Sequence, residues 1–200
     1  MDKEIKLFSS ENRGLLLNKI KSQSFDITVI GGGITGAGIC LDAISRGLKV
    51  CLIEMNDFAS GTSSKSTKLI HGGLRYLEQF NFSLVRETGK ERAVLHYIAP
   101  HIVKPEKMLI PISKGGKLNR FSTSLALSVY DFLANVKKKD RKKLISKNSI
   151  YKKEPLLSNG NIKGGAIYSE YRTDDSRLTI EILKKSYKMG AYPINYVKFI

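Results

Sequence analysis

Residues 26–54 read DITVIGGGITGAGICLDAISRGLKVCLIE, and this stretch decides the fold of the chain. A short apolar run leads into glycines at Gly31, Gly33 and Gly36, which are followed by an amphipathic segment and a second apolar run. Apolar runs of this kind are typical of parallel strands that are covered on both faces. The order of strand, tight turn, helix, turn and strand therefore predicts one βαβ unit.

The spacing of the glycines has a physical reason. Gly31 lets the chain turn sharply off the strand, Gly33 lets the backbone approach a pyrophosphate, and Gly36 lets helix and strand pack closely. Phosphates would then lie at the helix N-terminus, where free N–H groups and the helix dipole favour negative charge. Glu54 follows the last glycine by 18 residues, near the place where an acid binds an adenosine ribose. An acid here favours FAD or NAD over NADP.

The pattern GxGxxG alone is weak evidence in a chain with 17 glycines. The flanking strands, the helix and the terminal acid make it much more specific. The alternative is a glycine-rich turn in another kind of α/β protein.

Composition narrows the class of protein. A chain of 200 residues can form one large or two small domains, and a hydrophobic content of 42% is ordinary for a globular protein. No apolar run approaches the roughly 20 residues that span a bilayer, and the polar N-terminus shows no secretory signal. We expect Cys40 and Cys51 to be buried small hydrophobes without a disulfide or metal framework, which indicates a reducing compartment, most simply the cytoplasm.

The charge is unevenly distributed. The net charge is +16, of which residues 1–100 carry +3 and residues 101–200 carry +13, with a peak at 137–143. Nucleic acid, an anionic membrane surface or plain solvation could explain this excess. No aromatic residue interleaves the basic run and no nucleic-acid-binding module is evident, so we expect no nucleic-acid partner. A lysine-rich solvated face is the simplest interpretation, and attraction to an anionic membrane comes next.

A loop rich in hydroxyl groups follows the second strand, at the carboxyl edge where open parallel sheets bind ligands. Its polar residues suit a phosphate or a ribityl chain, although such a stretch could also be a surface linker. They are Thr62, Ser63, Ser64, Lys65, Ser66 and Thr67. Beyond them, Gly72 and Gly73 lie between His71 and Arg75, and either let the backbone pass close to something flat or make a turn.

The rest of the chain alternates between helical and strand-like segments. Helical spacing predicts helices over 81–96, 121–136 and roughly 174–189, and apolar runs predict strands over 108–112, 164–171 and 191–200. We expect the aromatic residues of the second of these helices to lie in the core. Asp174 and Asp175 are expected to cap the third helix. His96 and His101 are interpreted as structural residues.

Four stretches together resemble a known family. They are GGGITGAGI, DFASGTSSKSTKLIHGGLRYLEQF, ETGKERAVLHYIAPHI and YSEYRTDDSRLTIE. With them, the chain resembles FAD-dependent glycerol-3-phosphate dehydrogenases, the bacterial aerobic enzyme above all, and then glycerol-phosphate oxidases. The resemblance implies an α/β, Rossmann-like FAD-binding domain of the glutathione-reductase or amine-oxidase type. It also implies oxidation of sn-glycerol 3-phosphate to dihydroxyacetone phosphate, with electrons passed to membrane quinone.

The resemblance also implies roles for single residues. Glu54 would hold the adenosine ribose, and residues 62–67 would run beside the pyrophosphate, ribityl chain and flavin. His71 would lie next to the flavin as a base, and Arg75 near the substrate phosphate. These types suit the chemistry, because a histidine accepts a proton near neutrality and a guanidinium clamps a phosphate. The FAD pyrophosphate would be held by Gly31, Gly32, Gly33, Thr35 and Gly36.

Members of this family are much longer, so the chain is expected to be truncated: it would contain the beginning of an α+β substrate domain and stop within the FAD-binding domain. The predicted division is a lead-in at 1–25, a first FAD-binding part at 26–112, a helical and basic insertion at 113–160, and an incomplete return to the FAD-binding domain at 161–200. Three alternatives remain open: a non-catalytic remnant, an oxygen-using oxidase, and an NAD enzyme that would leave 57–80 unexplained.

Overall fold

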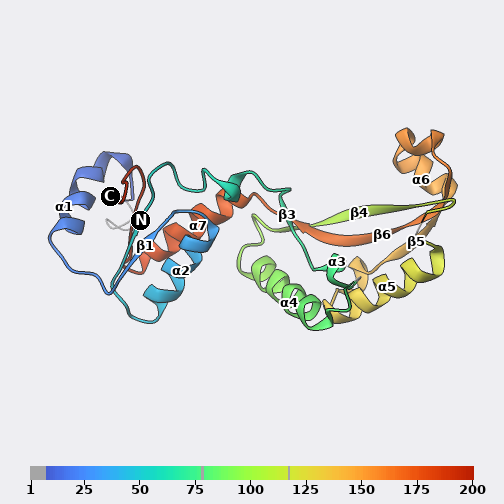
Figure 1. The fold of residues 1–200 in the computed structure, drawn as a ribbon, viewed down its shortest axis with the longest axis horizontal. Helices are drawn as coiled ribbons and strands as arrows, with labels where there is room; N and C mark the ends of the chain where they lie inside the picture. Colours follow the sequence, from blue (N-terminus) through green and yellow to red (C-terminus); the bar gives the residue numbers. More distant parts are fainter. Residues whose placement is uncertain (1–7, 78, 117) are drawn as a thin grey trace. The chain divides into compact units, whose positions relative to one another are not determined.

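The computed structural model divides the chain into two compact units (Figure 1). It describes residues 8–77, 79–116 and 118–200. The first unit contains the described residues up to Lys68 together with Asp174–Ile200, and the second is Leu69–Thr173.

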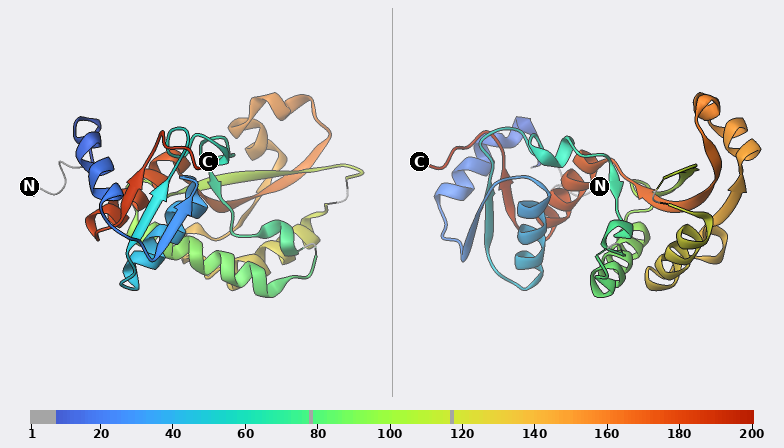
Figure 2. Two further views of the ribbon diagram at one scale, coloured as in Figure 1. Left: turned by 60° about the vertical axis from the view of Figure 1, so that its left-hand side comes forward. Right: turned by 45° about the vertical axis from the view of Figure 1, so that its right-hand side comes forward.

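The first unit is built on a parallel sheet with strand order β1-β2-β7. Its helices α2 and α7 pack on each other and close the core over the sheet, as Figure 2 shows. The predicted βαβ unit is therefore confirmed, whereas the expected strand over 191–200 is only three residues long. In chain order the elements are η2 (Ser10–Asn12), α1 (Arg13–Lys21), β1 (Ile27–Ile30), α2 (Ile34–Ser45), β2 (Val50–Ile53), η3 (Thr62–Ser64), α7 (Asp175–Lys188) and β7 (Tyr192–Ile194).

Small residues let α2 pack tightly in this core. Ala37 and Cys40 are fully buried and meet Val50 and Leu52 of the central strand. Cys51 is also buried, as predicted, and both cysteines are free thiols. Burial raises the pKa of the Cys51 thiol to about 11, so it remains protonated and inert.

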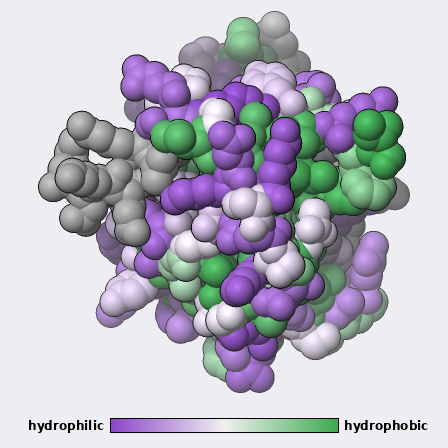
Figure 3. All heavy atoms as spheres, turned by 90° about the vertical axis from the view of Figure 1, so that its left-hand side faces the viewer, coloured by the Kyte–Doolittle hydropathy of each residue, from purple (hydrophilic) through white to green (hydrophobic). Residues whose placement is uncertain are grey.

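On the face seen in Figure 3, hydrophilic side chains are interspersed with smaller hydrophobic patches.

The second unit is an antiparallel sheet centred on β6, with β4 on one side and β3 and β5 on the other. Helices α4 and α5 pack against each other and against β6 through a cluster around Val85, Tyr130 and Ala134. Its elements are β3 (Leu69–Ile70), α3 (Leu74–Leu77), α4 (Phe82–Ile98), β4 (Lys104–Ser113), α5 (Arg120–Leu133), η4 (Lys138–Asp140), β5 (Lys143–Ser146), α6 (Lys147–Lys153), η5 (Pro155–Asn159) and β6 (Ile162–Arg172).

The long strand β4 extends further than the predicted 108–112. It includes Pro105 and Pro111, which pair with Tyr171 and Gly165 of β6. A proline lacks the N–H of the ladder, but β4 is an edge strand, so this group is not needed. Because β4 pairs with β6, the compact units divide at Lys68/Leu69 and Thr173/Asp174. The predicted functional divisions at 112/113 and 160/161 therefore do not coincide with them.

Helix α5 does not bury the aromatic residues as predicted. Phe121 is 79% exposed and Phe132 is 83% exposed, whereas Tyr130 is fully buried. The helix turns a face with hydroxyl and carboxyl groups toward the unit, which includes Thr123 and Asp131. The expectation that these phenylalanines lie in the core is therefore wrong.

The lysine-rich run also differs in part from the expected exposed connector. Its lysines at 137–139 are exposed, but Asp140 is buried and accepts a hydrogen bond from Lys107. The run then enters β5 at Lys143.

Candidate functional site

The turn between β1 and α2 depends on glycine at two positions, for a positive φ angle at Gly31 and for a close backbone contact at Gly36. Gly31 has φ = +111°, and its N–H donates to the carbonyl of Ile53 at 2.8 Å. A Cβ on Gly36 would lie 1.9 Å from the carbonyl oxygen of Gly31. The α2 N-terminus is thereby pressed against the end of β1, at the carboxyl edge of the parallel sheet. Such a helix start is suited to a phosphate group.

Glu54 lies directly against this turn. Its carboxylate accepts the N–H of Gly32 and the N–H of Asn56, each at 2.7 Å. A Cβ on Gly32 would meet Glu54 Cβ at 2.9 Å and a ring atom of Phe58 at 2.7 Å. The glycine turn and the acid at the end of β2, which are 22 residues apart, are therefore in direct contact at the carboxyl edge of the sheet, where open parallel sheets form their ligand-binding crevice.

Side chains of the hydroxyl-rich loop, residues 62–67, contact two different helices of the first unit. Ser63 accepts the N–H of Ile34 through its Oγ at 2.8 Å, so a side chain of the loop meets the start of α2. Ser66 points elsewhere and donates to the carboxylate of Asp175 at 2.5 Å. Ser64 donates to the carbonyl of Gly61 at 3.2 Å. Thr62, Lys65 and Thr67 are exposed.

Asp175 was expected only to help cap α7, and this expectation is incomplete. Asp174 is the N-cap and accepts the N–H of Arg177 at 3.0 Å. Asp175 instead pairs with Lys68, whose ammonium also donates to the carbonyl of Ser64 at 2.5 Å. Lys68 has φ = +61°, a conformation uncommon for a lysine. The start of α7 therefore holds the end of the hydroxyl-rich loop.

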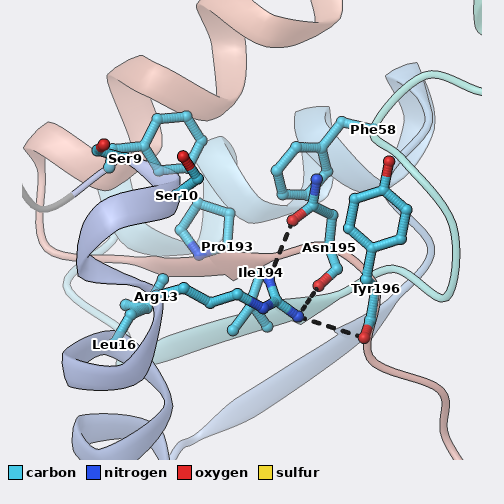
Figure 4. A pocket seen from close by; sticks show the side chains of 10 residues that line it. Ser9, Ser10, Arg13, Leu16, Phe58, Pro193, Ile194, Asn195 and Tyr196 are labelled. Carbon is cyan, nitrogen blue, oxygen red and sulfur yellow. Dashed lines mark hydrogen bonds between the residues drawn. The ribbon is translucent and has the colours of Figure 1, made fainter.

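A cavity of about 280 Å³ lies between the segment 8–16 and the end of β7, with Phe58 and Tyr196 on its wall (Figure 4). Arg13 spans it, donating to the carbonyls of Asn195 at 2.6 Å and Tyr196 at 3.2 Å. The side-chain amide of Asn195 donates in turn to Asp57 at 2.8 Å. This chain of contacts joins the segment before β1 to the loops after β2 and β7. Sequence reasoning missed it, because no local pattern marks Arg13.

His71 and Arg75 belong to the second unit and are both exposed. His71 follows β3, and Arg75 lies on the short helix α3. The intervening Gly72 is buried and packs against Tyr130 and Arg92, so its lack of a side chain has a packing reason. His96, by contrast, contacts the carbonyl of Val103 at 2.8 Å through Nδ1, as a structural histidine would.

A parallel sheet with a glycine turn at a helix start and an acid at the next strand end defines a dinucleotide-binding protein. A family model described as FAD dependent oxidoreductase matches residues 26–198. The chain therefore belongs to this family, and the predicted fold class is confirmed.

The sequence is similar to particular members. It is 55% identical over 191 residues to the aerobic glycerol-3-phosphate dehydrogenase of Bacillus subtilis (strain 168), and 55% identical over 190 residues to that of Staphylococcus aureus (strain USA300). These matches cover 96% and 95% of this chain, but 34% of each relative. The predicted resemblance is confirmed, and the chain spans about a third of the length of these relatives.

Solved structures of FAD-binding proteins are similar to this chain. The glycerol-3-phosphate dehydrogenase from Bacillus halodurans, complexed with FAD, is 42% identical with a TM-score of 0.71 and matches 96% of this chain and 30% of its own. An L-α-glycerophosphate oxidase from Mycoplasma pneumoniae has a TM-score of 0.63 at 17% identity, over 87% of this chain and 45% of its own. The second likeness is one of fold alone.

Proposed function

We propose that this protein serves the FAD-dependent oxidation of sn-glycerol 3-phosphate to dihydroxyacetone phosphate, with membrane quinone as the electron acceptor. The observation that carries the proposal is the crevice in which Gly36 closes on Gly31 and the Glu54 carboxylate meets the same turn. The similarity to aerobic glycerol-3-phosphate dehydrogenases supports the substrate.

FAD fits the residues of this crevice. The segment that contains Gly31, Gly32, Gly33, Thr35 and Gly36 would hold its pyrophosphate at the start of α2, because four of these five residues carry no side chain. Glu54 would accept hydrogen bonds from the adenosine ribose. Ser63, already at the start of α2, would approach the phosphates together with the rest of the loop 62–67. Bound FAD supplies a flavin that accepts a hydride.

His71 and Arg75 are assigned the substrate chemistry. Oxidation of a secondary alcohol releases a hydroxyl proton, and an exposed imidazole can act as the base that accepts it. The guanidinium of Arg75 would bind the phosphate of the substrate through paired hydrogen bonds.

Titration of the purified chain with FAD tests the cofactor assignment, with quenching of flavin fluorescence as the signal. We expect saturable binding that Glu54→Gln weakens by about tenfold, the value of one charge-assisted hydrogen bond. Glu87→Gln is the control, because Glu87 is an exposed acid on α4. Equal FAD affinity of both variants would contradict the role of Glu54. Binding of NAD without FAD would favour the NAD alternative.

A phenazine-coupled assay with sn-glycerol 3-phosphate tests the reaction itself. Turnover that His71→Asn abolishes, and that Arg75→Met weakens chiefly by raising KM, supports the proposal. A chain that binds FAD without turnover would favour the non-catalytic alternative. Oxygen consumption with stoichiometric peroxide would identify an oxidase instead.

We further propose a cytoplasmic protein that attaches peripherally to the inner face of the plasma membrane. Helix α5 carries an exposed apolar stripe formed by Phe121, Leu125 and Phe132. Arg86 and Lys90 of α4 line a hollow together with Phe132, which places two cations beside this stripe. Within the part of the chain that the structure describes, no helix is long and apolar enough to cross a bilayer.

Exposed lysines strengthen the membrane proposal. Those at 137–139 follow α5 directly, and each basic group near an anionic surface contributes about 1 kcal/mol. We expect the chain to sediment with phosphatidylserine vesicles at low salt, and less so at high salt. Phe121→Ser with Phe132→Ser should weaken this binding, whereas Leu156→Ser, at an exposed leucine outside the stripe, should not. Salt-independent or absent binding would remove the proposal.

A further inference from the structure

Three polar side chains from three elements meet in the interior of the second unit. Arg92 of α4, Tyr130 of α5 and Glu170 of β6 are each at most 2% exposed. Arg92 Nη1 lies 2.9 Å from Glu170 Oε2 and donates to Tyr130 Oη at 2.5 Å. Tyr130 Oη donates to Glu170 Oε1 at 3.1 Å. These three residues are referred to below as the buried triad.

The triad is fully connected. Burial first, and the neighbouring Glu170 carboxylate next, raise the pKa of Tyr130 far above its ordinary value, so the phenol keeps the proton that it donates. Arg92 also donates to the carbonyl of Ser169 at 3.4 Å, and its guanidinium lies 4.8 Å from the ring centre of Tyr171. Glu170 therefore has partners at both oxygens.

Stability alone does not account for such a cluster. Desolvation of two charges costs several kcal/mol, and apolar side chains of similar volume are often as stable or more stable in the same place. A carboxylate can nevertheless do one thing that an apolar group cannot, which is to accept a hydrogen bond from the backbone. Glu170 Oε2 accepts the N–H of Gly72 at 3.0 Å.

Gly72 is closely fitted to the triad. A Cβ there would lie 2.0 Å from Tyr130 Oη and 2.5 Å from Arg92 Nη1, so only glycine can approach. One residue earlier in the chain than His71, Ile70 pairs with Tyr171 in the sheet. His71 is thus held between two anchors, the ladder at Ile70 and the carboxylate at Gly72. After Gly73, whose φ is +83°, the chain turns into α3 and Arg75.

We infer that Glu170, held by Arg92 and Tyr130, is a positioning residue that fixes the backbone at Gly72 and so the placement of His71 and Arg75. The inference rests on the proposed function, since it adds a support to the segment that carries the substrate-side groups. The triad itself is sealed from solvent and acts through Gly72.

The decisive experiment follows the Gly72 amide by NMR in the ¹⁵N-labelled 200-residue chain. In Glu170→Gln, a neutral acceptor replaces the carboxylate and leaves the charge of Arg92 without its partner. We expect the Gly72 amide signal to move upfield and its hydrogen exchange to accelerate about tenfold or more. The His71 ring signal should broaden or shift. The amide of Ala166, between β4 and β5 in the sheet, reports general opening and should change much less.

Asp140→Asn is the matched control. Asp140 is also a buried acid paired with a cation, Lys107 at 3.2 Å, and its carbonyl accepts from Ser169, the neighbour of Glu170. In the described part of the chain, Asp140 forms no hydrogen bond or ion pair with residues 71–75. This variant should leave the Gly72 amide and the His71 ring as in the unsubstituted chain.

A triple variant separates positioning from stability. Arg92→Met, Tyr130→Phe and Glu170→Leu together replace the triad by apolar side chains of similar size, which such clusters tolerate. We expect this variant to fold with normal circular dichroism but with an unprotected Gly72 amide. If it fails to fold, the single Glu170→Gln change decides the question.

An unchanged Gly72 amide in the folded variants would overturn the inference. FAD titration of the same proteins keeps it distinct from the proposed function. Loss of Gly72 protection with no FAD binding in any protein would leave the anchor standing and refute the cofactor assignment. FAD binding together with an unchanged Gly72 amide would support the cofactor assignment and refute the anchor at Gly72.

Discussion

The two compact units hold their proposed functional residues in opposite ways. In the first, the crevice is made of backbone together with the Glu54 carboxylate, and its shape depends on the absence of side chains at Gly32 and Gly36. In the second, the segment of His71 is held by long side chains from three distant elements, joined at Glu170. One site is local and steric, whereas the other is long-range and electrostatic.

Each unit is therefore sensitive to a different kind of substitution. A crevice formed by close backbone contact fails when an atom is added, because the helix start must move away from the strand. A segment anchored by buried charges fails when one partner is removed, because the remaining charge stays buried without compensation. The predictions below test this contrast, beginning with the largest effect.

The loss of Arg92 alone should have the largest effect. Arg92→Leu leaves Glu170 buried and unpaired, and we expect the free energy of unfolding to fall by about 3–5 kcal/mol. Urea denaturation followed by circular dichroism measures it. The double variant Arg92→Leu with Glu170→Leu removes both charges and should recover much of the loss. A double variant less stable than the single one would contradict this account.

The addition of one methyl group to the glycine turn should come next. Gly36→Ala places a Cβ where it would lie 1.9 Å from the Gly31 carbonyl oxygen, so backbone must shift. We expect a loss of about 2–3 kcal/mol in stability, and a loss of FAD binding. Gly38→Ala is the control on the same helix, because its Cβ would meet nothing within 4 Å. That change should stabilise the chain by about 0.5–1 kcal/mol, since alanine favours helix.

The same contrast explains what the sequence could predict. The glycine spacing, the apolar runs and Glu54 lie within 29 consecutive residues, and local steric rules were enough to locate the βαβ unit and its crevice. Arg92, Tyr130 and Glu170 are far apart in the chain, and nothing local marks them as partners. Gly72 was the one signal of this cluster in the sequence, because a glycine next to a candidate base can allow other side chains to pack closely against the backbone.

Pairing between distant segments accounts for the other errors. The strand over 108–112 was predicted too short, because the prolines of β4 obscured the rest of a strand that pairs with β6. Helical spacing predicted the length of α5 but not its orientation. Its inward face binds polar partners, such as Lys142, whose N–H donates to Asp131 at 2.9 Å, and so Phe121 and Phe132 face outward.

The support for the hydroxyl-rich loop should show a smaller effect. Asp175→Asn weakens the contacts with Lys68 and Ser66, and we expect FAD affinity to fall by about three- to tenfold as the loop loosens. Glu181→Gln is the control, because Glu181 on the same helix pairs with Arg177 and Lys184 instead. Equal affinities for the two variants would show that α7 does not hold the loop.

Protonation of Asp175 in acid should have the smallest effect on the free energy of unfolding. The direction of the pKa shift of this carboxyl group gives the sign of that effect. Burial opposes ionisation there, but hydrogen bonds from Lys68 and Ser66 outweigh it, so the pKa of the folded carboxyl lies below its ordinary value of 3.8. Near and below that value the unfolded state binds more protons. The contribution of Asp175 is therefore complete above about pH 5 and is lost as the pH falls through the folded pKa. Since the pair is partly solvated, we expect less than about 1 kcal/mol.

Urea unfolding at pH 6 and at pH 3 isolates this contribution when the unsubstituted chain is compared with Asp175→Asn. Other carboxyl groups titrate over the same range, including Glu181, whose pKa is lowered chiefly by its hydrogen bond with Lys184. Both proteins should therefore lose stability in acid, and the unsubstituted chain should lose slightly more. If Asp175→Asn instead loses more stability in acid than the unsubstituted chain, then burial, and not the pairing with Lys68, dominates the pKa of the Asp175 carboxyl group. The loop would then depend on packing, and Asp175 would not be a charged anchor of the kind that Glu170 is for Gly72.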